Sequence, residues 1–513
     1  MKSNNIFLMA ALLLTGCTTT PPQLSESPHW QLQPLSLYDS GHDKGTEIIS
    51  VQQHTLRAVL SNFDTGEVDM LDVSHPEKIS RIKRFGLGLN KGEEFTSVAF
   101  HPLLDAFAAV VDAGNNRGRL EIRSASSGAL LDHVEVGYGP DAVVFSKEGG
   151  VVLVANEGED FSFDKSTGEF FSAEGSISII HLDKHGHVKA NNTLELANVK
   201  HREGFVVEEK GHFLEREIDW DADGKISKKT DFDGNGVIEN KKVKIGHFEG
   251  ADVYANEQKG EAKILIPVTS ESSTLLEPEY IALSSDTSKA YVTMQETNEV
   301  AEVDVLNGRV LGYYGMGVSK HDADRKADGW VAFEQSINAL REPDGIALTP
   351  DGQYFVTADE GDTDIEANSV SEGEAMLQSG GRTVSIFDTK TGDFVADTGN
   401  QLDEITFANS VYPDRRSNKK GAEPEMLVTF EMDGQPWVVA GLERADAVVL
   451  ISLADPAHPN VVALGKIPGD DSRSPEGIAH FEVNGEHYLL TANEMNGTVA
   501  GFKVVRHAVK IEH

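Results

Sequence analysis

The strongest constraint on the fold is a motif that recurs seven times between residues 46 and 505. Five clear copies begin at Gly139, Glu277, Glu342, Glu423 and Ser474. In each of them a proline and an acidic residue open a short apolar run, as in GPDAVVF and EPDGIAL, and a polar turn and two further apolar runs follow. Such a repeat indicates a repeat architecture, in which each unit buries its apolar face against the next.

Two degenerate copies precede these, beginning at Thr46 and Glu93, and they keep the acidic residue as Glu47 and Glu94. The apolar runs have four to eight residues, are rich in β-branched and aromatic types, and are bounded by turn residues, which is typical of strands. Three or four strands per unit, repeated seven times, predict an all-β, seven-bladed β-propeller. The alternative is an array of β-sandwich domains. Amphipathic helical patterns are sparse, which disfavours a helical solenoid.

The acidic residue of each copy lies just before the first strand, which lines the central channel in a propeller. We therefore expect a ring of carboxylates at one channel mouth, formed by Glu47, Glu94, Asp141, Glu279, Asp344, Glu425 and Glu476. So many carboxylates destabilise one another unless cations bind or some are protonated. Oxygen ligands suit calcium, magnesium or manganese, so a divalent metal at the mouth is expected. Alternatively, the proline and acid only form a strand-initiating turn.

The second strands end in polar residues that either approach the same mouth or lie one strand outward. They are Asn156, Glu157, Gln295, Glu296, Asp359, Glu360, Glu443, Asn493 and Glu494. Arg341 and Arg473 lie just before proline–acid pairs, which makes them candidate anion-binding residues near the mouth.

Between the third and fourth copies the repeat is interrupted by DWDADGKISKKTDFDGNGVIEN, residues 219–240. Acidic residues at alternate positions followed by glycine match the first part of a calcium-binding EF-hand loop, twice. The candidate ligands are Asp219, Asp221 and Asp223 in the first loop and Asp231, Asp233 and Asn235 in the second. We expect calcium here to hold a long surface loop in shape, the alternative being a solvated acidic loop.

The match is incomplete, because Thr230 and Lys242 stand where an EF-hand loop carries a bidentate glutamate. The insert is therefore closer to tandem aspartate-rich calcium loops than to a calcium sensor.

The N-terminus, MKSNNIFLMAALLLTGC, has a positive residue and an apolar stretch too short to span a bilayer. Leu14 to Cys17 match the bacterial lipobox, in which the cysteine thiol receives the lipid. An ordinary secretory signal is the alternative. Cys17 is the only cysteine, which excludes a disulfide. Thr18 after it favours the outer membrane in a Gram-negative cell, on the periplasmic or surface face.

The formal net charge of -38 makes nucleic acid an improbable partner, since the surface repels phosphate. The expected partners are the membrane, through the lipid, and a protein, glycan or small-molecule ligand. We expect a monomer. No hydrolase motif such as G-x-S-x-G or H-E-x-x-H is present in the sequence, and acylation leaves Cys17 without a thiol nucleophile.

The repeats resemble a known family. The segments EPEYIALSSDTSKAYVTMQETNEVAEVDV, REPDGIALTPDGQYFVTADEGDTD and SPEGIAHFEVNGEHYLLTANEMNGTVAGFKV are similar to the choice-of-anchor I domain, found in bacterial proteins similar to mesenchyme-specific cell surface glycoprotein. The resemblance extends over about residues 37–505. It implies a secreted or surface-held propeller, and it implies no catalytic residues.

These features predict a cell-envelope lipoprotein whose calcium-stabilised propeller acts as a binding or adhesion module. The alternative is a metal-dependent hydrolase, phytase-like or lactonase-like, with its site at the channel mouth. The expected divisions are a signal peptide at 1–16, a lipidated tether at 17–36, the propeller at 37–505 with an insert at 191–263 carrying calcium loops at 219–242, and a tail at 506–513.

Overall fold

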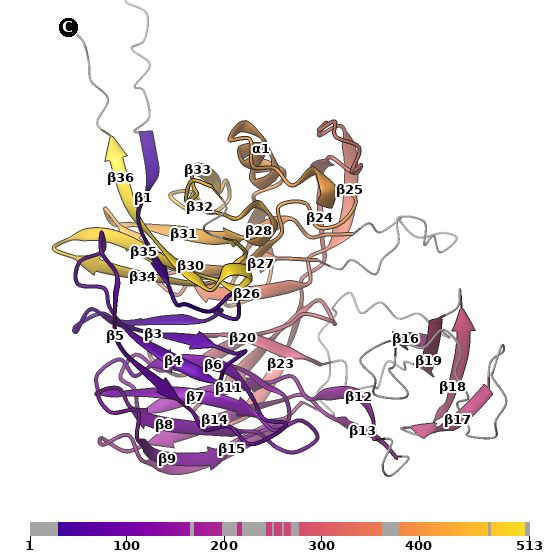
Figure 1. Ribbon diagram of the computed structural model, residues 1–513. Coiled ribbons are helices and arrows are strands. Elements are labelled where there is room, and N and C mark those ends of the chain that lie inside the picture. The colour runs from indigo at the N-terminus through magenta and orange to yellow at the C-terminus, as the bar shows by residue number, and fades with distance from the viewer. Residues whose placement is uncertain are drawn as a thin grey trace, which may run out of the picture.

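Seven four-stranded antiparallel sheets form the blades of a β-propeller within the part of the chain that the structure describes (Figure 1). This computed structural model describes residues 29–164, 169–196, 213–217, 243–248, 251–258, 261–267, 276–361, 379–469 and 473–507. The predicted all-β propeller with seven blades is therefore confirmed.

In blades 1 to 6 the strands follow the order of the chain, with the first strand innermost. Blades 1 to 3 consist of β2 (Ile49–Gln52), β3 (Arg57–Asn62), β4 (Glu67–Asp72) and β5 (Ser80–Gly86); β6 (Glu94–Phe100), β7 (Ala106–Asp112), β8 (Arg119–Ser124) and β9 (Leu130–Glu135); and β10 (Pro140–Phe145), β11 (Val151–Asn156), β14 (Ser176–Leu182) and β15 (Val188–Glu195). Blades 4 to 6 consist of β20 (Pro278–Leu283), β21 (Lys289–Met294), β22 (Glu299–Asp304) and β23 (Arg309–Gly315); β26 (Pro343–Leu348), β27 (Tyr354–Asp359), β28 (Thr383–Asp388) and β29 (Phe394–Asp397); and β30 (Pro424–Met432), β31 (Gln435–Leu442), β32 (Ala447–Ser452) and β33 (Asn460–Gly465).

Blade 7 joins the two ends of the described chain. It consists of β34 (Pro475–Val483), β35 (Glu486–Asn493), β36 (Thr498–His507) and, as its outermost strand, β1 (His29–Asp39). Trp30 of β1 packs edge-on against Trp437 of blade 6 with ring centroids 4.6 Å apart, and Leu32 is buried. Residues 29–36, which the sequence assigned to the tether, therefore lie in a strand of the propeller.

The first strands contact one another in a closed ring, in the order β2, β6, β10, β20, β26, β30, β34 and back to β2. The core lies between the blades, where sheet packs on sheet. Middle strands are buried on both faces and read as continuous apolar runs, as in AFAAVVD of β7, whereas the outermost strand β9 is largely exposed. This burial on both faces explains why such a run shows no alternation of polar and apolar residues.

Several shorter elements lie outside the blades. They are the hairpins of β12 (Glu159–Asp164) with β13 (Glu169–Ala173) and β24 (Val318–Ala323) with β25 (Gln335–Leu340); helix α1 (Gln401–Ala408); and the 3-10 turns η2 (Asp414–Arg416), η3 (Glu443–Ala445) and η4 (Glu494–Asn496). Within the described ranges, no helix is long and apolar enough to cross a membrane.

Between blades 3 and 4 a separate sheet contains β16 (Phe213–Glu217), β17 (Val243–Phe248), β18 (Ala251–Gln258) and β19 (Glu261–Pro267) in the order β16-β19-β18-β17. The predicted insert began at residue 191, but β15 of blade 3 continues to Glu195. The predicted calcium loops at 219–242, the signal peptide and Cys17 lie outside the described residues.

Candidate functional site at the channel mouth

The acidic residue of the motif lies in a break of the strand register in five blades. In blade 3, for example, Pro140 pairs with Asn156 and Ala142 with Ala155, so Asp141 between them has no partner across the sheet. Similar breaks contain Glu279, Asp344, Glu425 and Glu476. A bulge of this kind redirects a side chain, and here it follows directly on the motif proline.

The residue before that proline has a positive φ in four of these blades, at Gly139, Glu342, Glu423 and Ser474. The chain thus makes a sharp turn immediately before the inner strand begins. The strand-initiating turn considered as an alternative is present, and it is the element that places the acidic side chain.

Six of the seven predicted ring residues are linked electrostatically. Burial, followed by repulsion from Glu476 and Asp141, raises the pKa of Glu47 to about 9. Burial, followed by Glu157, Asp141 and Asp344, likewise raises the pKa of Glu279 well above its usual range. Repulsion between these carboxyl groups means that they lie close enough to affect one another's ionisation.

The same pattern continues around the mouth. Burial, followed by repulsion from Glu360 and Glu476, raises the pKa of Asp344. For Asp141 burial raises the pKa to about 6, and for Glu476 burial, then the repulsion of Glu443 and Glu494, outweighs a lowering contact with Glu425 and raises it to about 7. Glu94 differs, because it is exposed at the start of β6, where the register break comes later, between Phe95 and Ser97.

Acidic residues at the ends of the second strands join the inner ones. Carboxylate oxygens lie within 4.8 Å of one another in three clusters, which are Asp141 with Glu157 and Glu279; Glu360 with Glu423 and Glu425; and Glu425 with Glu443 and Glu476. Of these, Glu423 was not singled out in the sequence, although its place directly before the motif proline would have been the signal. Asn156 and Asp359, by contrast, are fully buried and bond within their own blades.

The cluster of Glu425, Glu443 and Glu476 contains buried carboxylate oxygens that accept no hydrogen bond. Glu425 is 8% exposed and Glu443 is 2% exposed, and the Oε2 atom of each is buried without a hydrogen-bond partner. The Oε1 atom of Glu443 accepts from Arg444, whose Nε also lies 3.2 Å from Oε2 of Glu423. One arginine is therefore shared between neighbouring acids, while two buried carboxylate oxygens have no donor.

The arginines considered as anion-binding residues lie differently from what the sequence suggested. Arg341 is 3% exposed, and it donates to Ser385 Oγ, to the carbonyls of Met316 and Val318, and to Asp397 at 2.5 Å. Its guanidinium links blade 5 to the segment that follows blade 4 and is not presented to an anion at the mouth. Arg473 is exposed.

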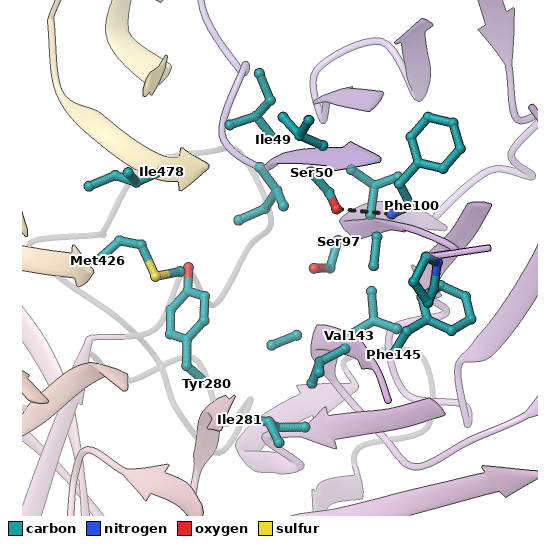
Figure 2. A pocket seen from close by; sticks show the side chains of 18 of the residues that line it. Ile49, Ser50, Ser97, Phe100, Val143, Phe145, Tyr280, Ile281, Met426 and Ile478 are labelled. Atoms are coloured by element: carbon teal, nitrogen blue, oxygen red, sulfur yellow. Dashed lines mark hydrogen bonds between the residues drawn. The ribbon is translucent and has the colours of Figure 1, made fainter. Parts of the chain in front are cut away.

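Inside the ring of first strands lies a cavity of about 420 Å³. Its wall is largely apolar, and Figure 2 shows Tyr280, Met426 and Ile478 across the space from Ile49, Ser97 and Val143. Several lining residues follow directly on ring acids in the sequence, as Tyr280 follows Glu279 and Met426 follows Glu425. The acidic mouth therefore adjoins an apolar chamber.

The three clusters at the mouth offer carboxylate oxygens, the ligands that calcium, magnesium and manganese prefer. Lys420 donates to Glu360 in one of these clusters. The two oxygens without a donor would gain most from a cation, because a buried carboxylate without compensation is costly.

Comparison with known proteins gives a family and a fold. The model of the choice-of-anchor I domain matches residues 47–376 and 363–456, which confirms the family resemblance. Among the curated proteins, none matches the sequence.

Solved structures with a similar arrangement include hydrazine synthase from Kuenenia stuttgartiensis, which is 13% identical with a TM-score of 0.51 over 92% of this chain and 100% of that chain. A chain of the mitotic checkpoint complex is 10% identical with a TM-score of 0.46, over 97% of this chain and 99% of that chain. The C-terminal WD40 domain of Sif2 is 9% identical with a TM-score of 0.44, over 94% of this chain and 99% of that chain. At these identities a likeness concerns the fold alone.

Proposed function

Because the chain belongs to the choice-of-anchor I domain family, we propose that it is a binding module of the cell envelope whose ligand site is the acidic channel mouth. The proposed primary ligand is a divalent cation of the calcium or manganese class. The bound cation would then present open coordination positions to a protein, glycan or small-molecule ligand.

The observation that carries this proposal is the pair of buried carboxylate oxygens without a donor, Oε2 of Glu425 and Oε2 of Glu443. Glu476 completes a group whose oxygens lie within 4.8 Å of one another. Buried acids with raised pKa values are typical of functional sites, because a purely structural carboxylate is ordinarily paired.

The hydrolase alternative is not carried further. It called for an arginine or lysine at the mouth to hold a phosphate, and within the described residues Arg341, Arg444 and Lys420 are each engaged by neighbouring acids. A mouth rich in carboxylates also repels anionic substrates.

Anchoring and the calcium loops remain part of the proposal. We propose that Cys17 carries the lipid, because Leu14 to Cys17 match the lipobox. Metabolic labelling with a clickable palmitate analogue should mark the wild type and not Cys17→Ser.

We also propose that calcium stabilises the insert, and the support for this is the spacing of the acidic residues. The proposed ligands are Asp219, Asp221, Asp223, Asp231, Asp233 and Asn235.

The proposal that the mouth binds a cation is tested by measuring the metal content of the full chain after dialysis against trace calcium or manganese. The background is the insert variant with Asp221, Asp223 and Asp233 all changed to Ala. We expect this background to retain stoichiometric metal, and Glu425→Gln with Glu476→Gln added to it to lose that metal.

The matched control adds Asp433→Asn with Asp455→Asn instead, since these acids are exposed and the charge change is equal. It should retain the metal. If the insert variant alone holds no metal, the mouth is not a cation site and the proposal is wrong.

A further inference from the structure

A second group of metal-ligating side chains lies far from the mouth, at the hairpin end of blade 7. Glu482 of β34 pairs directly with His487 of β35. His480 lies two residues before Glu482 and so projects from the same face of the sheet. One ligand atom from each of the three residues lies within 4.8 Å of the others. The hairpin register thus gathers two imidazoles and a carboxylate.

The distances suit a single ion. His480 Nε2 lies 3.0 Å from His487 Nδ1, and His487 Nδ1 lies 3.9 Å from Glu482 Oε1. Two ring nitrogens bound to one tetrahedral zinc at about 2.0–2.1 Å are separated by roughly 3.3 Å. Small side-chain rotations would therefore let all three groups reach one cation.

The surroundings hold the imidazoles in place and leave the third group accessible. Phe430 of blade 6 stacks on His480 with ring centroids 4.2 Å apart and an interplanar angle of 11°. The side chain of His487 is 15% exposed and that of Glu482 is 48% exposed. Burial, and secondarily His487, lower the pKa of His480 to about 4.

We propose that His480, Glu482 and His487 bind a transition-metal cation of the zinc class, with the remaining coordination position open to solvent. Two imidazoles and a carboxylate favour zinc and similar metals, whereas the carboxylates of the mouth favour calcium. Glu476 at the mouth and Glu482 are six residues apart on β34, about 20 Å along an extended strand. The two sites are therefore separate, and this inference does not depend on the proposed function.

Zinc titration of the full chain by calorimetry, with calcium in large excess to occupy oxygen-only sites, tests the proposal. We expect one zinc per chain, and we expect His480→Gln with His487→Gln to weaken its binding by more than about 100-fold, because losing two ligands costs more than the 10- to 100-fold typical of losing an outer-shell partner. Glu482→Gln should weaken it by about tenfold. Cobalt bound at the same site should show the visible absorption of tetrahedral coordination, and this absorption should vanish in the histidine variant.

The matched control is His185→Gln with His187→Gln, two exposed histidines in the turn between β14 and β15. Their backbone N–H groups bond to Asp183, which assigns that turn a structural role. Binding should be unchanged in this control. Far-UV circular dichroism and the metal-free Tm show whether the variants fold, and zinc should raise the Tm of the wild type and of the control only.

If zinc does not bind in excess calcium, or binds equally well to the His480 and His487 variant, the two imidazoles form only a hydrogen-bonded pair and the inference is wrong. Loss of binding in the His185 and His187 control alone would also overturn it.

Discussion

Two regions of the propeller bury carboxylates, and they differ in whether every buried carboxylate oxygen has a hydrogen-bond donor. Beside blade 5, Asp403 and Arg382 are 1% and 2% exposed and lie 3.2 Å apart, and Arg382 also donates to the carbonyl of Ser417. At the mouth, Glu425 and Glu443 are also buried, yet each keeps an oxygen without a donor. Both oxygens of Asp403 accept hydrogen bonds, from Arg382 and from the Ala422 N–H, so this acid completes the fold. A buried acid that keeps an oxygen without a donor is suited to a partner from outside.

The largest expected effect comes from breaking the paired region. Arg382→Met leaves Asp403 as an isolated buried charge, which should lower the free energy of unfolding by about 3–5 kcal/mol. Urea denaturation followed by circular dichroism measures this loss. Adding Asp403→Asn should recover part of it, and a loss below about 1 kcal/mol would mean that the pair is not structural.

At the mouth, removing a charged group should change the free energy of unfolding in the opposite direction. Glu476 has a pKa raised to about 7, so at pH 8 it is ionised in the fold at a cost. Glu476→Gln removes that cost and should stabilise the metal-free chain by roughly 2 kcal/mol at pH 8. Urea denaturation without metal measures the gain. Destabilisation would show that Glu476 already has a sufficient internal partner.

The stability of the mouth should also depend on pH. The pKa of Glu47 is raised from 4.5 to about 9, so the folded state binds this proton more tightly than the unfolded chain does. The resulting stability is fully present below pH 4.5 and is lost as the pH rises toward 9. We expect the metal-free Tm to fall across this range.

Calcium or manganese should flatten that curve, because the cation replaces the proton as ionisation proceeds. The Glu47→Gln variant is the control, and its metal-free Tm should fall less. A Tm that is independent of pH from 5 to 9 would contradict the inference that burial and neighbouring carboxyl groups raise the pKa of Glu47.

The smallest effect is expected at Arg473, which is exposed, in contrast to the buried Arg341. Arg473→Ala should change the free energy of unfolding by no more than about 0.5 kcal/mol. Phosphate binding, measured by calorimetry with wild type and variant, should be equally negligible in both. Binding that Arg473→Ala removes would restore the hydrolase alternative.

Much of the fold could be predicted from the sequence because the motif carries its own geometry. The proline sets the turn, the acid follows it, and the uniform apolar run marks the strand buried on both faces. Glu94 shows the limit of this reasoning, since the copy without proline has its register break in another place and leaves the acid exposed.

The site was predictable in position and not in detail. Arg341 precedes a motif proline, so its backbone lies near the mouth, but its side chain turns inward to Ser385 and Asp397. Spacing along a chain does not specify the direction of a long side chain. The pairing of β1 with β36 was missed for a related reason, because a strand supplied from the other end of the chain belongs to no repeat.

That pairing has a consequence for the order of folding. β36 is made last and β1 first, so blade 7 cannot be completed until nearly the whole chain has been synthesised. Until then the other blades form an open arc with two unprotected edges, which are prone to associate with other chains. Joining residues so distant in sequence is also slow. The propeller should therefore be most prone to association before β1 has paired with β36.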